Sequence, residues 1–156
     1  MRIPIITLLT DFGTRDHYVA SMKGVILNIN PRCTLVDITH QVGPHNIKEG
    51  VFALTHAFSS FPKGTIHLSV VDPGVGGPRK PLLWVTSNYF FVGPDNGLFT
   101  LILRKEKVKK VMRYSGPRML LHHPVLALHH AVDGFKSPDK AKVKTRTVGS
   151  KVEGKV

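Results

Sequence analysis

The sequence predicts an α/β fold in which a mostly parallel sheet is flanked by helices. Three observations support this fold class. Short apolar runs alternate with amphipathic stretches over the first hundred residues. The apolar residues of the amphipathic stretches recur at helical spacing, and the connections between elements are short. Glycine, proline and other turn residues mark the ends of most runs, as expected of a β-α-β-α-β chain.

The first three elements follow this alternation directly. An apolar run over residues 5–10 predicts a strand, and the turn signal at 11–13 ends it. Helical spacing predicts a helix over residues 16–30, because Pro31 cannot continue it. The apolar residues at this spacing are Val19, Met22, Ile26 and Ile29. A second strand is expected over residues 34–40.

The remaining elements complete the α/β pattern. A second helix is expected over residues 47–61, and a third strand over residues 65–71. The apolar face of that helix holds Val51, Leu54 and Phe58. Two runs at 82–86 and 89–92 predict a hairpin. Residues 98–103 fit either a helix or a strand.

Length and composition indicate one cytoplasmic domain. The chain has 156 residues, of which 42% are hydrophobic and 21% charged, as in ordinary globular domains. Its single cysteine, Cys33, excludes an internal disulfide and fits a reducing compartment. The chain has no uncharged apolar run long enough to cross a bilayer, and its apolar N-terminal stretch is too short for a signal peptide. We therefore expect no membrane partner.

Positive charge is concentrated in the C-terminal third of the chain. Residues 105–156 hold thirteen Lys/Arg and four Asp/Glu, which is +9 of the net charge of +12. From residue 136 onward large apolar side chains are few, which is typical of a solvated or mobile tail. No aromatic residue interleaves these charges, so nucleic-acid binding is disfavoured. We expect a domain over residues 1–113 and a diverged or truncated basic segment over residues 114–156.

Polar residues stand where the first predicted strand ends. In open α/β sheets, ligands bind outside the carboxyl ends of the strands. Asp11 ends the first strand before any helix begins, so its carboxylate could accept both hydroxyls of a ribose. Asp16 fits two interpretations equally, a ligand contact or a capping or first-turn acid of the following helix.

The third predicted strand ends at a second acid, which we expect at the same edge of the sheet as Asp11. Asp72 follows the strand, and Arg79 comes seven residues later across a loop rich in glycine. Glycine permits backbone conformations closed to other residues, so this loop can bring Arg79 back toward Asp72. A catalytic Asp–Arg pair and a structural ion pair are equally compatible with this spacing. The glycines match neither of the common phosphate-binding spacings.

The histidines do not predict a metal site. Two pairs, His122-His123 and His129-His130, stand seven positions apart. Seven residues advance about 10.5 Å along a helix, whereas the ligands of one zinc ion lie about 2 Å from it. His67 falls inside a predicted strand and is expected in the core or an interface.

Four segments in this order resemble the N-terminal domain of the S-adenosylmethionine hydroxide adenosyltransferases. They are LLTDFGTRDHYVASMKG, DITHQVGPHNIKEG, VVDPGVGGPRK and VGPDNGL, and the similarity covers about residues 3–104. That family belongs to the same superfamily as the S-adenosylmethionine-dependent fluorinases and chlorinases. The resemblance implies cleavage of the C5′–sulfur bond of S-adenosylmethionine by water or hydroxide, which gives adenosine and methionine. It implies no cofactor and no metal.

The resemblance also implies roles for individual residues. Asp11 matches the family's ribose-binding acid, and Asp16 matches the second acid of that motif. Asp72 and Arg79 match two members of the Asp-Arg-His set that positions and activates water. The halogenating relatives carry a non-acidic residue where this chain has Asp72, which favours hydroxide over halide.

Two features depart from the family pattern. The HGRD-like motif that carries the family's histidine is missing, although His122, His123, His129 and His130 fall in the corresponding region. Family members continue into a β-rich second domain and assemble as trimers, with the active site between subunits. Here a basic segment follows residue 113. We therefore expect a hydrolase of S-adenosylmethionine, homotrimeric if the family assembly is retained, with a non-catalytic homologue that folds without turnover as the alternative.

Overall fold

The computed structural model describes residues 3–74, 81–113 and 144–146. The elements, in chain order, are β1 (Ile5–Thr10), α1 (Tyr18–Ile29), β2 (Thr34–Thr39), α2 (Ile47–Ala57), the 3₁₀ turn η1 (Phe58–Ser60), β3 (Ile66–Val70), β4 (Pro81–Thr86), β5 (Phe90–Pro94), α3 (Thr100–Lys105), β6 (Val108–Arg113) and β7 (Lys144–Arg146).

The strands form one mixed sheet in the order β2-β1-β3-β5-β4-β6-β7. The first half is parallel, because β1 pairs in parallel with β2 and β3, and β3 pairs in parallel with β5. In the second half, β4 is antiparallel to β5 and β6, and β7 is antiparallel to β6. The predicted α/β fold class is therefore confirmed, with the parallel strands on the N-terminal side of the sheet.

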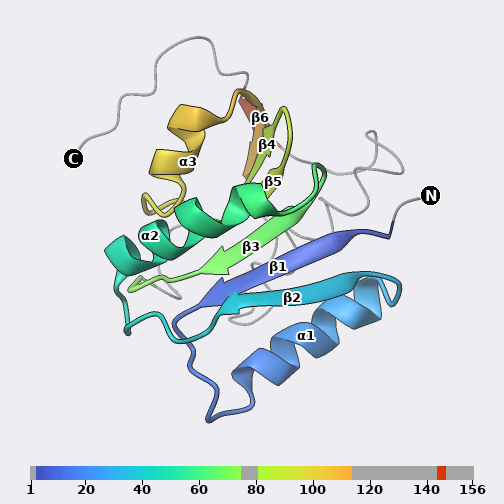
Figure 1. Ribbon diagram of the computed structural model, residues 1–156, viewed down its shortest axis with the longest axis vertical. Helices are drawn as coiled ribbons and strands as arrows, with labels where there is room; N and C mark the ends of the chain where they lie inside the picture. The colour runs from blue at the N-terminus through green and yellow to red at the C-terminus, as the bar shows by residue number, and fades with distance from the viewer. Residues whose placement is uncertain (1–2, 75–80, 114–143, 147–156) are drawn as a thin grey trace.

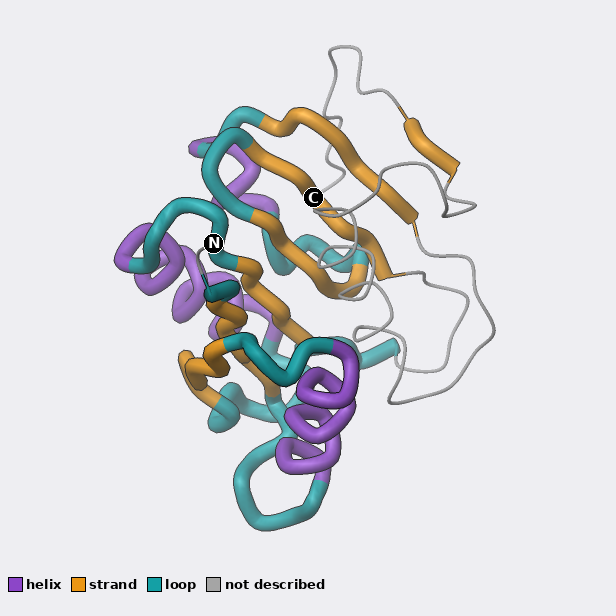
Figure 2. Tube along the Cα trace, turned by 90° about the vertical axis from the view of Figure 1, so that its right-hand side faces the viewer, coloured by secondary structure: helices purple, strands orange, loops and turns teal. Residues whose placement is uncertain are grey.

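Helices cover both faces of this sheet (Figures 1 and 2). Alternate residues of β1 and β3 point to opposite faces, and each face is apolar and buried. The α1 face is packed from Ile6, Leu8, Met22, Ile26, Ile66, Leu68, Val70, Leu83 and Val92. The face under α2 and α3 is packed from Leu9, Val42, Leu54, Phe58, Val71, Tyr89, Phe91, Leu98, Phe99 and Ile102. The three layers enclose two cores that share one sheet.

Most of the predicted elements are confirmed. The first three strands, the first two helices and the hairpin of β4 and β5 lie where the sequence pattern placed them. The ambiguous segment after residue 97 contains a helix, α3. Two strands were not predicted. In β6, exposed lysines at 109 and 110 obscure the apolar pattern, and β7 lies in the segment that was expected to be a mobile tail.

No helix within the described ranges is long and apolar enough to span a membrane.

The close approach of β5 to β3 depends on a glycine. A Cβ atom on Gly93 would lie 2.3 Å from the Ser69 carbonyl oxygen and 2.9 Å from the ring of Phe99. The carbonyl belongs to the backbone of a central strand, so it cannot move aside without disturbing the sheet. Gly93 is therefore required for β5 to continue the parallel half of the sheet.

We expect Gly93→Ala to lower the free energy of unfolding by about 2 kcal/mol or more, because the added methyl group collides with backbone. Gly24→Ala is the matched control, since a Cβ at this position of α1 meets nothing within 4 Å. That change should raise stability by about 0.5–1 kcal/mol through helix propensity. Urea denaturation of both variants measures the effect, and equal stability of the two would contradict the packing argument.

Candidate functional site

The carboxyl ends of β1 and β3 meet at one edge of the sheet. Thr10, the last residue of β1, stands opposite Val70, the last residue of β3, in parallel register. The arrowheads of β1, β2 and β3 accordingly point to the same end of the molecule (Figure 1). From β1 the chain passes through α1 on one face of the sheet to β2. From β2 it passes through α2 on the other face to β3. In this topology the crevice between β1 and β3 is the expected place for a ligand.

Asp11 and Asp72 follow the two strands at this edge. Asp11 follows β1 directly, and Asp72 follows β3 after one residue, Val71. The sequence prediction that both acids share one edge is therefore confirmed for the backbone. Asp72 Oδ1 accepts a hydrogen bond of 2.9 Å from the Gly74 N–H, which turns the chain as soon as it leaves the strand.

Asp11 is held by a residue that the sequence did not single out. The backbone N–H of His45 donates to Asp11 Oδ2 at 2.8 Å, and His45 Nδ1 lies 3.8 Å from the same oxygen. His45 has φ of 61°, a left-handed conformation uncommon outside glycine. Only 10% of the Asp11 side chain is exposed. Within the described residues no donor pairs with Asp11 Oδ1, so this oxygen can serve a ligand.

Asn96 connects the loop after β5 to the chain that follows β3. Its side-chain amide donates to the Val71 carbonyl at 2.7 Å, and its Oδ1 accepts from the Leu98 N–H at 3.2 Å. The loop after β5 is thereby fixed beside the residue that precedes Asp72. The turn cluster around residues 93–97 was visible in the sequence, but its contact with β3 depends on the sheet order.

The other two predicted site residues are Asp16 and Arg79. Asp16 is exposed and lies one position before the N-cap of α1, His17, and the first turn of α1 contains no acid. The interpretation of Asp16 as a cap or first-turn acid is therefore wrong, because the helix begins two residues later than expected. Arg79 lies outside the described residues, as do the paired histidines after residue 120.

His67 belongs to the core, as one of the two interpretations of its position predicted. It is fully buried. Its Nδ1 lies 2.7 Å from Thr7 Oγ1, its ring stacks on Phe91, and its Nε2 has no hydrogen-bond partner among the described residues. Burial lowers the pKa of His67 to about 3, because the charged ring would lose its hydration. His67 therefore stays neutral near pH 7 and takes no part at the strand edge.

No group of three or more His, Cys, Asp or Glu side chains within the described ranges could hold a metal ion.

The sequence matches a known protein family over most of its length. The family described as the SAM hydroxide adenosyltransferase N-terminal domain matches residues 6–145, which is most of the chain. The chain belongs to this family. The match runs from within β1 to within β7, so it extends past the boundary expected at residue 113.

Among curated proteins, the (R)-S-adenosyl-L-methionine hydrolase of Methanocaldococcus jannaschii is 44% identical over 121 residues, which cover 74% of this adenosyltransferase-family chain and 46% of the hydrolase. The fluorinase of Nocardia brasiliensis is 26% identical over 146 residues, covering 79% of the chain and 49% of the fluorinase. The chain thus spans less than half the length of these curated relatives.

Among solved structures, an uncharacterized conserved protein from Thermotoga maritima superposes with a TM-score of 0.79 at 31% identity. The superposition covers 94% of this chain and 61% of the Thermotoga maritima chain. The three-layer fold is therefore shared with an experimentally determined relative.

His67 should make folding sensitive to acid. The unfolded chain takes up a proton on this ring below about pH 6.5, whereas the folded chain does so only near pH 3. Above pH 6.5 the ring is neutral in both states, so His67 does not reduce the free energy of unfolding. Between pH 6.5 and pH 3 the unfolded chain alone binds the proton, so the free energy of unfolding falls by about 1.4 kcal/mol for each pH unit. Urea denaturation at pH 7 and pH 5 should show a smaller loss for His67→Gln than for the parent chain. The exposed His56 provides the control, His56→Gln, which should lose stability as the parent does.

Proposed function

We propose that this chain supplies the strand-end part of a site that hydrolyses S-adenosyl-L-methionine to adenosine and L-methionine. The observation that carries the proposal is the placement of Asp11 and Asp72 just after the ends of β1 and β3, at one edge of the sheet. Membership of the adenosyltransferase family and 44% identity to a named (R)-S-adenosyl-L-methionine hydrolase support it.

Asp11 is proposed to bind the ribose of the substrate. Its Oδ2 is already held by the His45 N–H, which fixes the carboxylate and leaves Oδ1 for a hydroxyl group. A charged acceptor of this kind strengthens each hydrogen bond it receives. Asp16, which follows in the same loop, is proposed as the second acid on the substrate.

Asp72 and Arg79 are proposed to act on the attacking water. The water oxygen forms a bond to C5′ while the C5′–sulfur bond breaks, and the electron pair of that bond leaves with the sulfur of methionine. Because a sulfonium becomes a neutral thioether, the leaving group requires no acid. The water loses one proton to solvent or a base. Asp72 would orient the water and Arg79, whose positive charge stabilises developing hydroxide.

The charge of Asp72 also bears on the choice of nucleophile. A carboxylate beside the reaction centre repels a halide ion, whereas it accepts a hydrogen bond from water. The lower identity to the fluorinase is consistent with this argument. We therefore propose water, not fluoride or chloride, as the nucleophile.

The family resemblance extends the proposal to assembly. We propose a cytoplasmic homotrimer in which residues 1–113 form the α/β domain, the diverged basic segment after them adds the strand β7, and a neighbouring subunit completes the substrate site. A homologue that binds S-adenosylmethionine without turnover is the second candidate, favoured by the missing HGRD-like motif.

Three variants of the intact chain separate these roles. Asp72→Asn and Arg79→Gln should each slow adenosine formation about 100-fold or more, because they remove transition-state contacts, and should leave the dissociation constant of S-adenosylmethionine nearly unchanged. Asp11→Asn should weaken binding about tenfold or more. Chromatographic detection of adenosine and calorimetric titration measure the two effects.

Lys109→Gln is the control, because Lys109 is an exposed side chain on β6, three strands away from β3 in the sheet. It should change neither quantity. Adenosine formation that survives the loss of Asp72 or Arg79 would contradict the assignment. Binding by the parent chain without any adenosine would favour the non-catalytic homologue.

A further inference from the structure

A buried polar network lies beneath the turn that carries Asp11. Thr10 and His40 are 0% and 4% exposed, and Thr10 Oγ1 lies 2.8 Å from His40 Nδ1. The Phe12 N–H donates to the same Thr10 oxygen at 3.2 Å. The Gly13 N–H donates to the His40 carbonyl oxygen at 2.7 Å. His40 therefore holds the turn on both sides of Asp11, through its side chain and through its backbone.

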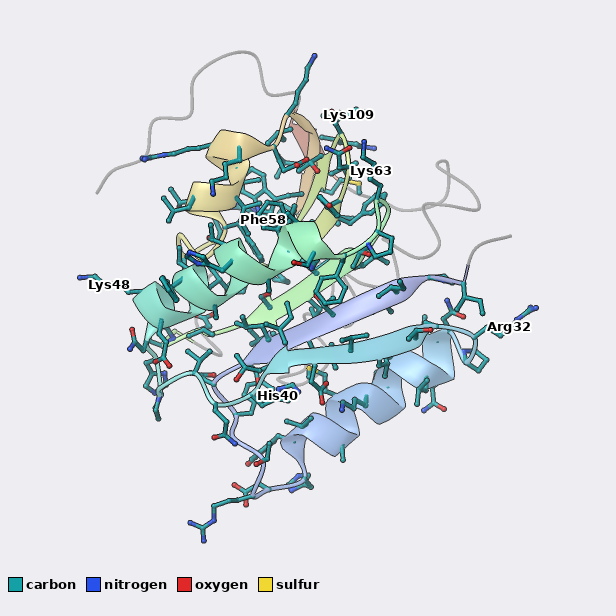
Figure 3. All side chains as sticks on the ribbon, viewed as in Figure 1. Arg32, His40, Lys48, Phe58, Lys63 and Lys109 are labelled. Atoms are coloured by element: carbon teal, nitrogen blue, oxygen red, sulfur yellow. The ribbon has the colours of Figure 1, made fainter. Side chains whose placement is uncertain are left out.

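The network continues from His40 to helix α1. His40 Nε2 lies 3.1 Å from Asp37 Oδ1, off the line of a regular hydrogen bond, and Asp37 Oδ2 accepts a hydrogen bond of 2.6 Å from Lys23. Figure 3 shows His40 at the arrowhead end of β2, on the side of α1. Partial burial opposes ionisation of Asp37, but its contacts with Lys23 and His40 outweigh this effect and lower the pKa of Asp37.

The ionised carboxylate fixes the hydrogen-bond directions in this network. A carboxylate only accepts, so in neutral His40 the proton belongs on Nε2, facing Asp37, and Nδ1 must accept. The Thr10 hydroxyl then donates to Nδ1, and a lone pair of its oxygen accepts from the Phe12 N–H. The Thr10 hydroxyl thus donates one hydrogen bond, to His40, and accepts one, from Phe12.

The order Asp37–His40–Thr10 is that of an acid, a base and a hydroxyl nucleophile, but burial excludes this use. Thr10 is fully buried, and its oxygen already accepts a backbone N–H. A nucleophile must reach the reacting carbon, which this oxygen cannot do. The network can only act through the turn above it.

We propose that His40 is a positioning residue for substrate binding, because it locks the turn over residues 10–13 and thereby sets the position of the Asp11 carboxylate. The inference rests on the proposed role of Asp11 as the acceptor of ribose hydroxyls. Asp37 and Lys23 extend this support to α1.

A second Thr–His pair provides a matched control. Thr7 and His67 lie 2.7 Å apart, are equally buried, and join the same strand, β1, to a neighbouring strand. Thr7 stands three residues before Thr10 and so points to the opposite face of the sheet. Among the described residues this pair has no hydrogen bond to the turn.

The test compares Thr10→Val, Thr10→Ser, His40→Phe and Thr7→Val in the intact chain. Thr10→Val keeps the shape of the side chain and removes the hydroxyl, whereas Thr10→Ser keeps the hydroxyl. The first readout is hydrogen exchange of the Phe12 and Gly13 amides. The second is calorimetric binding of S-adenosylmethionine and of its analogue lacking the ribose 2′ and 3′ hydroxyls.

We expect Thr10→Val and His40→Phe to speed exchange at Phe12 about tenfold and to weaken binding of S-adenosylmethionine by a similar factor. Binding of the analogue should change little, since it lacks the groups that Asp11 would contact. Thr10→Ser should behave as the parent chain. Thr7→Val should lower overall stability without changing either local exchange at the turn or the preference for the ribose hydroxyls.

Unchanged exchange at Phe12 in Thr10→Val would overturn the inference, and so would faster exchange without weaker binding. Equal weakening for the substrate and the analogue would also overturn it, because that result indicates general loss of structure. If the parent chain bound no S-adenosylmethionine, the proposed function would fail, whereas the exchange measurement would still decide whether His40 locks the turn. Should His40→Phe fail to fold, the near-isosteric Thr10→Val still decides the question.

Discussion

The candidate site depends on the parallel pairing of β1 with β3. The pairing brings the last residues of the two strands side by side, so the acids that follow them stand at one edge of the sheet. Because β1 lies between β2 and β3, right-handed crossovers place α1 and α2 on opposite faces of the sheet. Gly93 lets β5 approach β3 closely on its other side, and Asn96 then anchors the loop after β5 to the chain that follows β3.

Two buried Thr–His pairs connect β1 to its neighbours, and they differ in what they contact. His67 and Thr7 lie in an aromatic core, where the ring is kept neutral by burial and serves packing. His40 and Thr10 lie under the turn of Asp11 and connect it to a surface ion pair on α1. Residues of the same types, on neighbouring strands, thus differ in role because alternate residues of β1 point to opposite faces.

The sequence was sufficient to predict the elements that have regular apolar periods. The strands ending at Asp11 and Asp72 are short apolar runs bounded by turn residues, so the shared edge followed from the α/β alternation. It was insufficient for β6, where adjacent lysines break the period of a strand, and for the start of α1, which has no side-chain cap to mark it. The contacts of His45, His40 and Asn96 with the edge join residues 25 to 34 positions apart, and no local pattern encodes such contacts.

The central claim is that water attacks C5′ at the edge formed by β1 and β3. The most direct measurement is the fate of isotopic oxygen when the intact chain is incubated with S-adenosylmethionine in H₂¹⁸O containing chloride. The account predicts adenosine labelled at its 5′ oxygen, with methionine unlabelled and no 5′-chlorinated nucleoside. Unlabelled adenosine, or a halogenated product in its place, would contradict the account.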